Sequence, residues 1–207
     1  MNKIYLKKLT LLLGFVCTFL SVKAQVYTFT NAGATGINGP SQAQVDAAYA
    51  MTTLSGAVTS SNGIQLWTVP VGGNYKIEVY GAEGYGPLAG KGAYMSGVFM
   101  LSGGQQLKVL VGQQGGCCVG SGTNQYGGGG GSYVVTSANV PLIIAGGGGG
   151  ARYNTAIVPA SHGTVNNNGN PGTGSTNGAG GTGGNGGAEA GIAGGGGGFT
   201  GNGGGTP

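Results

Sequence analysis

Charged side chains are scarce in this chain of 207 residues, at 6% of the sequence against roughly 25% in ordinary globular domains. Four of the eight basic residues, Lys3, Lys7, Lys8 and Lys23, lie near the N-terminus. The other four basic residues equal the four acidic ones in number, so residues 25–207 have no net formal charge. A surface without excess positive charge lacks what nucleic acids and anionic lipids attract, so we expect neither as a partner.

Long hydrophobic runs are also missing, apart from one that extends from Leu9 to Leu20. That run follows three lysines and is too short for a membrane span. Val22-Lys23-Ala24 then has the small residues of a signal-peptidase site, and the ending "VKAQ" is similar to that of proteins secreted by Gram-negative bacteria. We expect residues 1–24 to be a signal peptide cleaved after Ala24. The product would be secreted or lie at the cell surface, with no membrane span in this chain.

Cysteine and histidine are nearly absent, which removes the usual residues of metal and redox sites. After the signal peptide the chain has two adjacent cysteines, Cys117 and Cys118, and one histidine, His162. Secreted cysteines oxidise, but neighbouring Cα atoms lie only about 3.8 Å apart, below the usual disulfide range. A strained bond between Cys117 and Cys118 and a bond to another chain therefore both remain open. His162 lacks the partners of a metal site or a catalytic triad, and we expect it to be a loop residue.

One stretch, "LIIAGGGGGA" at 142–151, matches the G-x-G-x-x-A pattern that binds dinucleotides. That pattern requires a helix after the glycines and an acidic residue about twenty positions later. Residues 151–172 contain two prolines and no Asp or Glu. Gly-rich chains produce this pattern by chance, so we expect no nucleotide cofactor, no metal and no enzymatic activity.

Two residue types have both a structural and a functional interpretation. Glu78 and Glu83 could form an acid–base pair, but nothing near them in the sequence indicates a raised pKa, so we expect surface charges. Trp67 could be an exposed platform for a ligand, but its place in an apolar segment favours packing in the core.

Short segments rich in β-branched and aromatic residues recur up to residue 145. We expect strands at 26–30, 64–69, 75–80, 94–101, 106–111, 132–135 and 141–145. In "YKIEVY" the apolar Tyr75, Ile77 and Val79 alternate with Lys76 and Glu78, which predicts one buried and one exposed face. Alternating strands without long helices between them favour an antiparallel β-sandwich.

One short helix is expected at about 42–51. Ser41 and Gln44 have the S-x-x-Q spacing of a capping box, directly after Pro40. The apolar side chains expected on one face of this helix are Val45, Ala48 and Tyr49.

Glycine is abundant, at 52 residues, and most of it lies after residue 80. In "GAGGTGGNGG" at 178–187 the side chains of Ala179, Thr182 and Asn185 recur every three residues, the period of a polyproline-II-type helix. Two faces of such a glycine helix are bare, so neighbouring backbones can approach and satisfy each other's hydrogen bonds. We expect helices of this kind at 127–131, 146–150, 178–187 and 194–198; a flexible glycine linker is the alternative.

Six segments, at 27–49, 63–70, 75–84, 110–116, 127–134 and 141–153, match one family in this order. The specific parts are "GPSQAQ", "GIQLW" and "LVGQQG". They resemble the extracellular glycine-rich domain of the anaplastic lymphoma kinase and leukocyte tyrosine kinase receptors, over about 27–205. The resemblance implies a jelly-roll sandwich like tumour necrosis factor, combined with a bundle of polyglycine helices, that binds a cytokine outside the cell.

The chain also departs from that family. It has no transmembrane helix and no kinase motif, so the kinase activity does not carry over. The receptors use an acidic surface for their cytokine, whereas the acids here are few and dispersed, and Val45 stands where the family has a cysteine. No closing strands are recognisable after the glycine-rich region, which favours a chain truncated at its C-terminus.

We therefore expect one domain over 25–207, mostly sandwich at 25–145 and mostly glycine-rich helices at 146–207. Its expected role is non-enzymatic recognition of a protein or glycan ligand outside the cell. The residues expected to contact that ligand lie beside glycine tracts: Tyr85, Tyr126, Arg152 and Tyr153. The alternative is a structural matrix or adhesin component that self-associates through the glycine helices.

Overall fold

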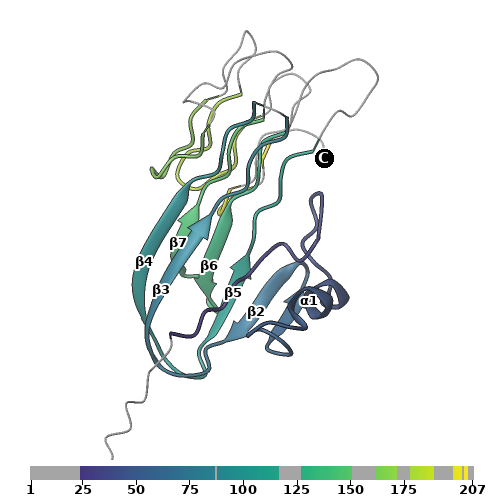
Figure 1. Ribbon diagram of the computed structural model, residues 1–207. Coiled ribbons are helices and arrows are strands. Elements are labelled where there is room, and N and C mark those ends of the chain that lie inside the picture. Colours follow the sequence, from purple (N-terminus) through teal and green to yellow (C-terminus); the bar gives the residue numbers. More distant parts are fainter. Residues whose placement is uncertain are drawn as a thin grey trace, which may run out of the picture.

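The computed structural model describes residues 24–86, 88–116, 127–150, 162–171, 178–188, 198–201 and 203–204. Within these ranges the protein is mainly β, with one short helix (Figure 1). The elements are α1 (Gln42–Tyr49), β1 (Val58–Ser61), β2 (Ile64–Thr68), β3 (Gly73–Tyr80), β4 (Tyr94–Leu101), β5 (Gln106–Leu110), β6 (Ser132–Thr136) and β7 (Pro141–Ala145).

The strands form two antiparallel sheets that lie face to face. One sheet has the order β1-β2-β5-β6-β7, and the other consists of β3 and β4, which cross in front of β6 and β7 (Figure 1). Side chains of both sheets contribute to one buried cluster, with Val79 and Leu101 from the small sheet and Val109, Val134 and Ile143 from the large one. The alternation of buried and exposed residues along β3 and β5 matches the prediction from the sequence.

Trp67 lies at the centre of this core, as the sequence predicts, and is only 5% exposed. Its ring packs against Tyr27, Phe29 and Tyr75, with centroid distances of 4.8, 5.9 and 6.1 Å. Tyr75 belongs to the small sheet and Trp67 to the large one, so this aromatic cluster joins the two layers.

The expectation of a strand at 26–30 is wrong. This segment is irregular, although Tyr27 and Phe29 pack on Trp67. Its backbone bonds to side chains instead of to a strand: Thr30 N–H donates to the Tyr49 hydroxyl at 2.9 Å, and Val26 O accepts from Thr53 Oγ1 at 2.6 Å. Aromatic anchoring without strand pairing explains why composition alone misassigned it.

The strand β1 was not expected from the sequence. It pairs with β2 through a two-residue turn at Asn62 and Gly63, whose φ angles are 50° and 78°. Positive φ at both central residues is the requirement of the tight turn that Asn-Gly favours in β-hairpins.

Helix α1 begins as predicted, with both bonds of the capping box at Ser41 and Gln44. It ends at Tyr49, two residues before the predicted end, and a turn bonded from Thr52 N–H to Tyr49 O follows it. Val45 and Tyr49 are buried, but Ala48 is exposed, so its predicted place on the buried face is wrong.

A buried polar network ties α1 to the large sheet. Gln65 is fully buried on β2, and its Nε2 donates to Thr30 O at 2.7 Å. The Tyr49 hydroxyl lies 2.6 Å from Gln65 Oε1 and accepts from Thr30 N–H. Because each buried polar group has a partner, the helix, the segment before it and β2 are held in one arrangement.

The glycine segments gather at one end of the sheets. In an antiparallel arrangement, the ends of β3, β5 and β7 and the starts of β4 and β6 all lie at the same end. The segments that leave these points, at 81–86, 90–93, 112–116, 127–131 and 146–150, therefore run side by side beyond the strands (Figure 1).

Backbone hydrogen bonds connect these segments directly. Gly129 N–H donates to Gly148 O and Gly148 N–H donates to Ala82 O, both at 2.8 Å. Ala82 N–H in turn donates to Gly130 O at 2.9 Å, so three segments distant in sequence form a closed set of bonds. Glycine segments before and after residue 145 thus share one hydrogen-bonded core.

The approach of these backbones leaves no room for side chains at particular positions. A Cβ atom on Gly147 would collide with Gly129 O, and one on Gly148 would collide with Gly90 O. A Cβ on Gly146 would have only one neighbour within 4 Å, Thr164 O at 3.9 Å. In this tract, one open position, with space for a side chain, is thus followed by two closed positions, where a side chain would collide with a neighbouring backbone.

The tract at 178–187 is not one continuous helix, contrary to expectation. Gly183 and Gly184 form a turn with φ angles of 59° and 87°, and Ala188 N–H then bonds back to Ala179 O at 2.8 Å. The period of three in the sequence therefore covers two segments and the turn between them. Of the tract expected at 194–198, only residue 198 lies within the described residues.

The buried network predicts a cost for removing one hydroxyl. Tyr49→Phe deprives the buried Gln65 Oε1 of its partner and removes a part-buried bond from Thr30 N–H, so we expect the free energy of unfolding to fall by about 1–3 kcal/mol. Urea denaturation followed by circular dichroism measures it. The control is Tyr75→Phe, whose hydroxyl donates to Val71 O at an exposed site that water can reach. Equal losses in both variants would contradict the role given to the network.

Adjacent glycines provide a second test. Gly147→Ala forces a side chain against Gly129 O, and we expect it to reduce the free energy of unfolding by about 1–3 kcal/mol. Gly146→Ala, with open space at its Cβ, should change it by less than about 0.5 kcal/mol. Thermal denaturation of the two variants checks this difference, and equal melting temperatures would show that the segments do not pack as described.

Candidate binding surface

One of the residues expected to contact a ligand lies in the described part of the chain. Tyr85 follows β3 in the loop to β4, is 38% exposed, and its N–H donates to Gly127 O at 3.0 Å. The glycine core therefore fixes the backbone of Tyr85. The other expected contacts, Tyr126, Arg152 and Tyr153, lie outside the described residues, as do the disulfide candidates Cys117 and Cys118.

The structure brings together a different set of exposed residues, on the outer side of the small sheet. We call this surface the β3–β4 face. Its members alternate with buried or half-buried residues along both strands, and the register pairs them across the sheet. The pairs are Asn74 with Met100, Lys76 with Val98, Glu78 with Ser96, and Tyr80 with Tyr94.

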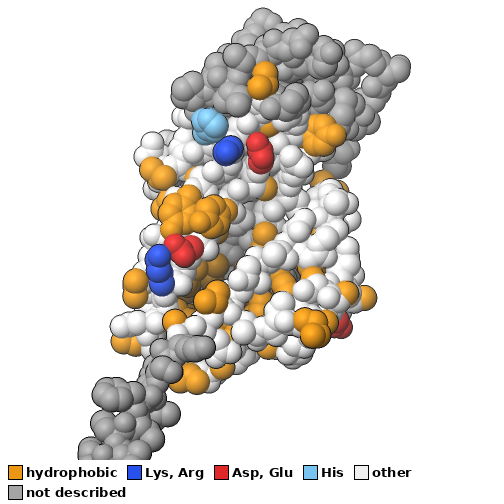
Figure 2. All heavy atoms as spheres, viewed as in Figure 1, with side chains coloured by type: hydrophobic (Ala, Val, Ile, Leu, Met, Phe, Trp, Pro, Cys, Tyr) orange, Lys and Arg blue, Asp and Glu red, His pale blue; other side chains and the backbone are white. Residues whose placement is uncertain are grey.

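Two tyrosines form one end of the β3–β4 face. Tyr80 and Tyr94 are 66% and 44% exposed, with ring centroids 4.8 Å apart and an angle of 36° between their planes. Figure 2 shows hydrophobic side chains gathered over this part of the molecule, beside one acidic and one basic side chain. At the other end of the face, Val98 and Met100 are 67% and 76% exposed.

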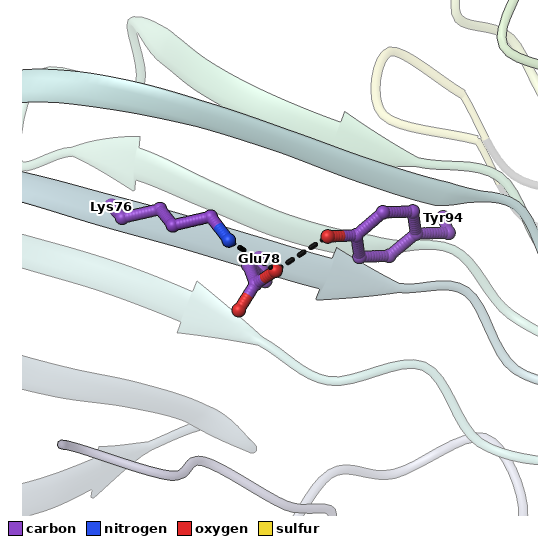
Figure 3. A network of polar contacts seen from close by, with 3 residues as sticks. All are labelled: Lys76, Glu78 and Tyr94. Atoms are coloured by element: carbon purple, nitrogen blue, oxygen red, sulfur yellow. Dashed lines mark hydrogen bonds and ion pairs between the residues drawn. The ribbon is translucent and has the colours of Figure 1, made fainter.

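A polar network separates the two ends. Glu78 Oε1 accepts hydrogen bonds from Lys76 Nζ at 2.8 Å and from the Tyr94 hydroxyl at 2.5 Å (Figure 3). Lys76 and Glu78 lie two residues apart on β3 and so point to the same side, while Tyr94 reaches them from the neighbouring strand. The network orients the Tyr94 ring at the edge of the aromatic pair.

These bonds shift the titration of all three groups. The hydrogen bond from Lys76, and next that from Tyr94, lowers the pKa of Glu78 because both favour its ionised form. The hydrogen bond to Glu78 raises the pKa of Lys76 and that of Tyr94. The carboxylate is therefore ionised and the ammonium charged at neutral pH, and the pair adds no net charge to the face.

A polar hollow of about 440 Å³ lies elsewhere, at the start of α1. No lining residue is ionisable: they are Asn38, Gly39, Pro40, Ser41, Gln42, Gln44, Ser60, Asn62 and Gly63. Among the described residues, no group of three or more His, Cys, Asp and Glu side chains could hold a metal ion. Nor does any described helix have the length and hydropathy to cross a membrane. His162 is a loop residue whose Nδ1 accepts from Lys91 N–H at 3.0 Å.

The structure defines a class of protein: a mainly β domain in which two antiparallel sheets carry a hydrogen-bonded glycine core at one end. No model of a known protein family matches the chain. The chain is similar to the leukocyte tyrosine kinase receptor of Mus musculus, with 40% identity over 102 residues. The match covers 43% of this chain and 11% of the receptor, so the chain spans about a tenth of the length of this curated relative. It therefore contains a region like part of that receptor.

The polar network gives a prediction for pH titration. In Lys76→Met the pKa of Glu78 should rise toward its ordinary value, because the hydrogen bond with the largest effect is lost. A lowered pKa in the folded protein means that the network is intact above the ordinary Glu pKa and is lost as pH falls through the folded value. Carboxyl ¹³C NMR across the acidic range measures this shift.

The matched control removes a lysine of the other sheet. Lys108 Nζ donates to Asn139 Oδ1 at 2.7 Å, so Lys108→Met deletes the same charge without touching Glu78. A Glu78 pKa that stays the same in Lys76→Met, or that shifts equally in both variants, would contradict the network.

Proposed function

We propose that this chain is a non-enzymatic recognition module that acts outside the cell. The observation that carries the proposal is the 40% identity to part of a receptor, the leukocyte tyrosine kinase receptor. Residues 1–24 would direct export and be removed after Ala24. The ligand would be a protein or a glycan, bound by side chains that the glycine core and the small sheet hold in place.

The finer architecture belongs to the same proposal. We assign a jelly-roll-like sandwich and a bundle of polyglycine-II helices. Supporting observations are the backbone bonds between the segments at 81–86, 127–131 and 146–150, and the one open position at Gly146 followed by two without room for a side chain at Gly147 and Gly148. A glycine helix with three residues per turn would present such a pattern to its neighbours.

The titration of Glu78 supports binding rather than catalysis at the β3–β4 face. A general acid near neutral pH needs a raised pKa, which burial in an apolar site provides. Glu78 is exposed, and the bond from Lys76 lowers its pKa. The same carboxylate is well placed to accept hydrogen bonds from a ligand while it orients Tyr94.

The test of this proposal is export followed by binding. Expressed with its leader, the chain should be recovered outside the cell with Gln25 as its first residue. Immobilised, it should bind a member of a panel of secreted proteins, receptor ectodomains and neutral oligosaccharides in a saturable way. Gly147→Ala, which disturbs the glycine core, should weaken that binding, whereas Gly146→Ala should retain it.

Light scattering on the same samples distinguishes a recognition module from a self-associating component. A recognition module should keep one mass over a range of concentrations. Growth of assemblies with concentration, with no saturable binding of any panel member, would favour a self-associating matrix or adhesin component instead. Turnover of any oligosaccharide in the panel would contradict the non-enzymatic role.

A further inference from the structure

The β3–β4 face is small. Each strand has eight residues, so it is about 27 Å long, and with strands about 5 Å apart the face covers on the order of 300 Å². A stable interface between folded proteins takes about 800 Å² from each partner. The size of the face therefore suits a small or extended ligand rather than a folded protein.

The charge of the face also restricts its ligand. Lys76 and Glu78 are the ionisable pair in its middle, and each neutralises the other. An acidic ligand would have to compete with Glu78 for the Lys76 ammonium, and a basic ligand would have to compete with Lys76 for the carboxylate. A neutral ligand avoids both costs.

The tyrosine rings and the Glu78 carboxylate favour a ligand with apolar faces and a polar rim. The rings of Tyr80 and Tyr94 pack against each other at a tilt, and both stay open to solvent, Tyr80 more than Tyr94. Beside them, Glu78 carries a second carboxylate oxygen, Oε2, that takes no part in the bonds to Lys76 and Tyr94. An aromatic side chain with a polar tip suits a partner that is apolar at one end and wet at the other.

From this geometry we propose that the β3–β4 face binds a neutral oligosaccharide of pyranose units with equatorial substituents, such as β-linked glucose. The C–H face of one sugar ring lies on the exposed ring of Tyr80, which Tyr94 supports from the side, and a ring hydroxyl donates to Glu78 Oε2. Lys76 is a positioning residue, since its hydrogen bond to Oε1 holds the Glu78 carboxylate in place. The inference rests on the proposed recognition role and names its ligand class and site.

The experiment uses the exported chain and the β-1,4-linked glucose hexamer, with NMR to locate the site and calorimetry to measure affinity. We expect saturable binding, with amide shifts confined to β3, β4 and the residues next to them. Tyr80→Ala and Tyr94→Ala should each weaken it about 2- to 10-fold. Tyr94→Phe keeps the ring but loses the bond to Glu78, so it should bind within about twofold of the parent chain while the Glu78 pKa rises.

Met51→Ala is the matched control, because Met51 is 98% exposed on the part of the molecule next to α1 and should leave binding unchanged. A hexamer of β-1,4-linked glucuronic acid, which differs from the neutral hexamer by a carboxylate on each sugar, should bind more weakly than the neutral hexamer. Tighter binding of the acidic hexamer would overturn the neutral class. Because the shifts are recorded on the parent chain, the site is located even if an alanine variant fails to fold.

The failure of this inference can be told apart from failure of the recognition role. Sugar binding with shifts away from β3 and β4, or with full affinity in folded Tyr80→Ala and Tyr94→Ala, would overturn the site and leave the recognition role standing. Binding of a protein but of no oligosaccharide would overturn the ligand class alone. No binding of any panel member would overturn both.

Discussion

The contact between bare glycine backbones is the constraint on which the rest of this structure depends. Five loop segments meet at one end of the sheets, and each has N–H and C=O groups that need partners. They find these partners in one another because no side chain keeps them apart, as the bonds among Ala82, Gly129 and Gly148 illustrate. In an ordinary sandwich these loops would be solvated and mobile. Here they form a second core of main-chain hydrogen bonds beside the apolar core around Trp67.

This arrangement explains why apolar residues are concentrated in the sheets and glycine in the segments beyond them. The sheets use alternating apolar residues to bury side chains, and the glycine segments use hydrogen bonds to bury backbone. Both are needed, since the closed set of bonds forms only where the ends of β3 and β7 and the start of β6 lie together. The loop that carries Tyr85 and joins β3 to β4 is held by the glycine core, so the β3–β4 face is fixed at this end by glycine contacts and at its back by apolar packing.

The sequence predicts well those features that local chemistry decides. Alternation revealed β3 and β5, and the capping box at Ser41 fixed the start of α1. The strand predicted at 26–30 failed because its aromatic residues fill the core from an irregular segment. The hairpin of β1 and β2 could have been found from Asn62-Gly63, a strong turn signal, although "VTSS" has only one apolar residue. At 178–187 a period of three was visible, but the turn at Gly183 was not, because glycine adopts positive φ without any mark in the sequence.

Only part of the candidate binding surface could be predicted from the sequence, for a similar reason. Lys76 and Glu78 could be placed on the wet side of β3 from alternation, and alternation in "YMSGVFML" puts Tyr94, Val98 and Met100 on one side of β4. What the sequence does not contain is the register that sets Tyr80 opposite Tyr94 and brings the Tyr94 hydroxyl to Glu78. The same register continues beyond the strands into the glycine core, where Gly81 N–H donates to Ala93 O at 2.9 Å. The contacts predicted at the ends of glycine tracts stay a prediction, and the structure adds a candidate surface on the sheet beside the tracts.

In the proposed recognition role, the scarcity of charge has a kinetic consequence. Residues 25–207 have no net formal charge, so long-range electrostatic steering would contribute little and the association rate should depend little on salt. Its affinity must come from contacts made after encounter, and these act mainly on the dissociation rate. Affinity from such contacts is higher when the surface is already rigid, because every side chain or loop that is ordered on binding costs free energy. At the proposed site, two tyrosines are held by one carboxylate and supported by close-packed glycine, so little ordering would remain to be done when a ligand binds. The same glycine that makes the sequence resemble a linker would thus provide the preorganisation that the proposed binding needs.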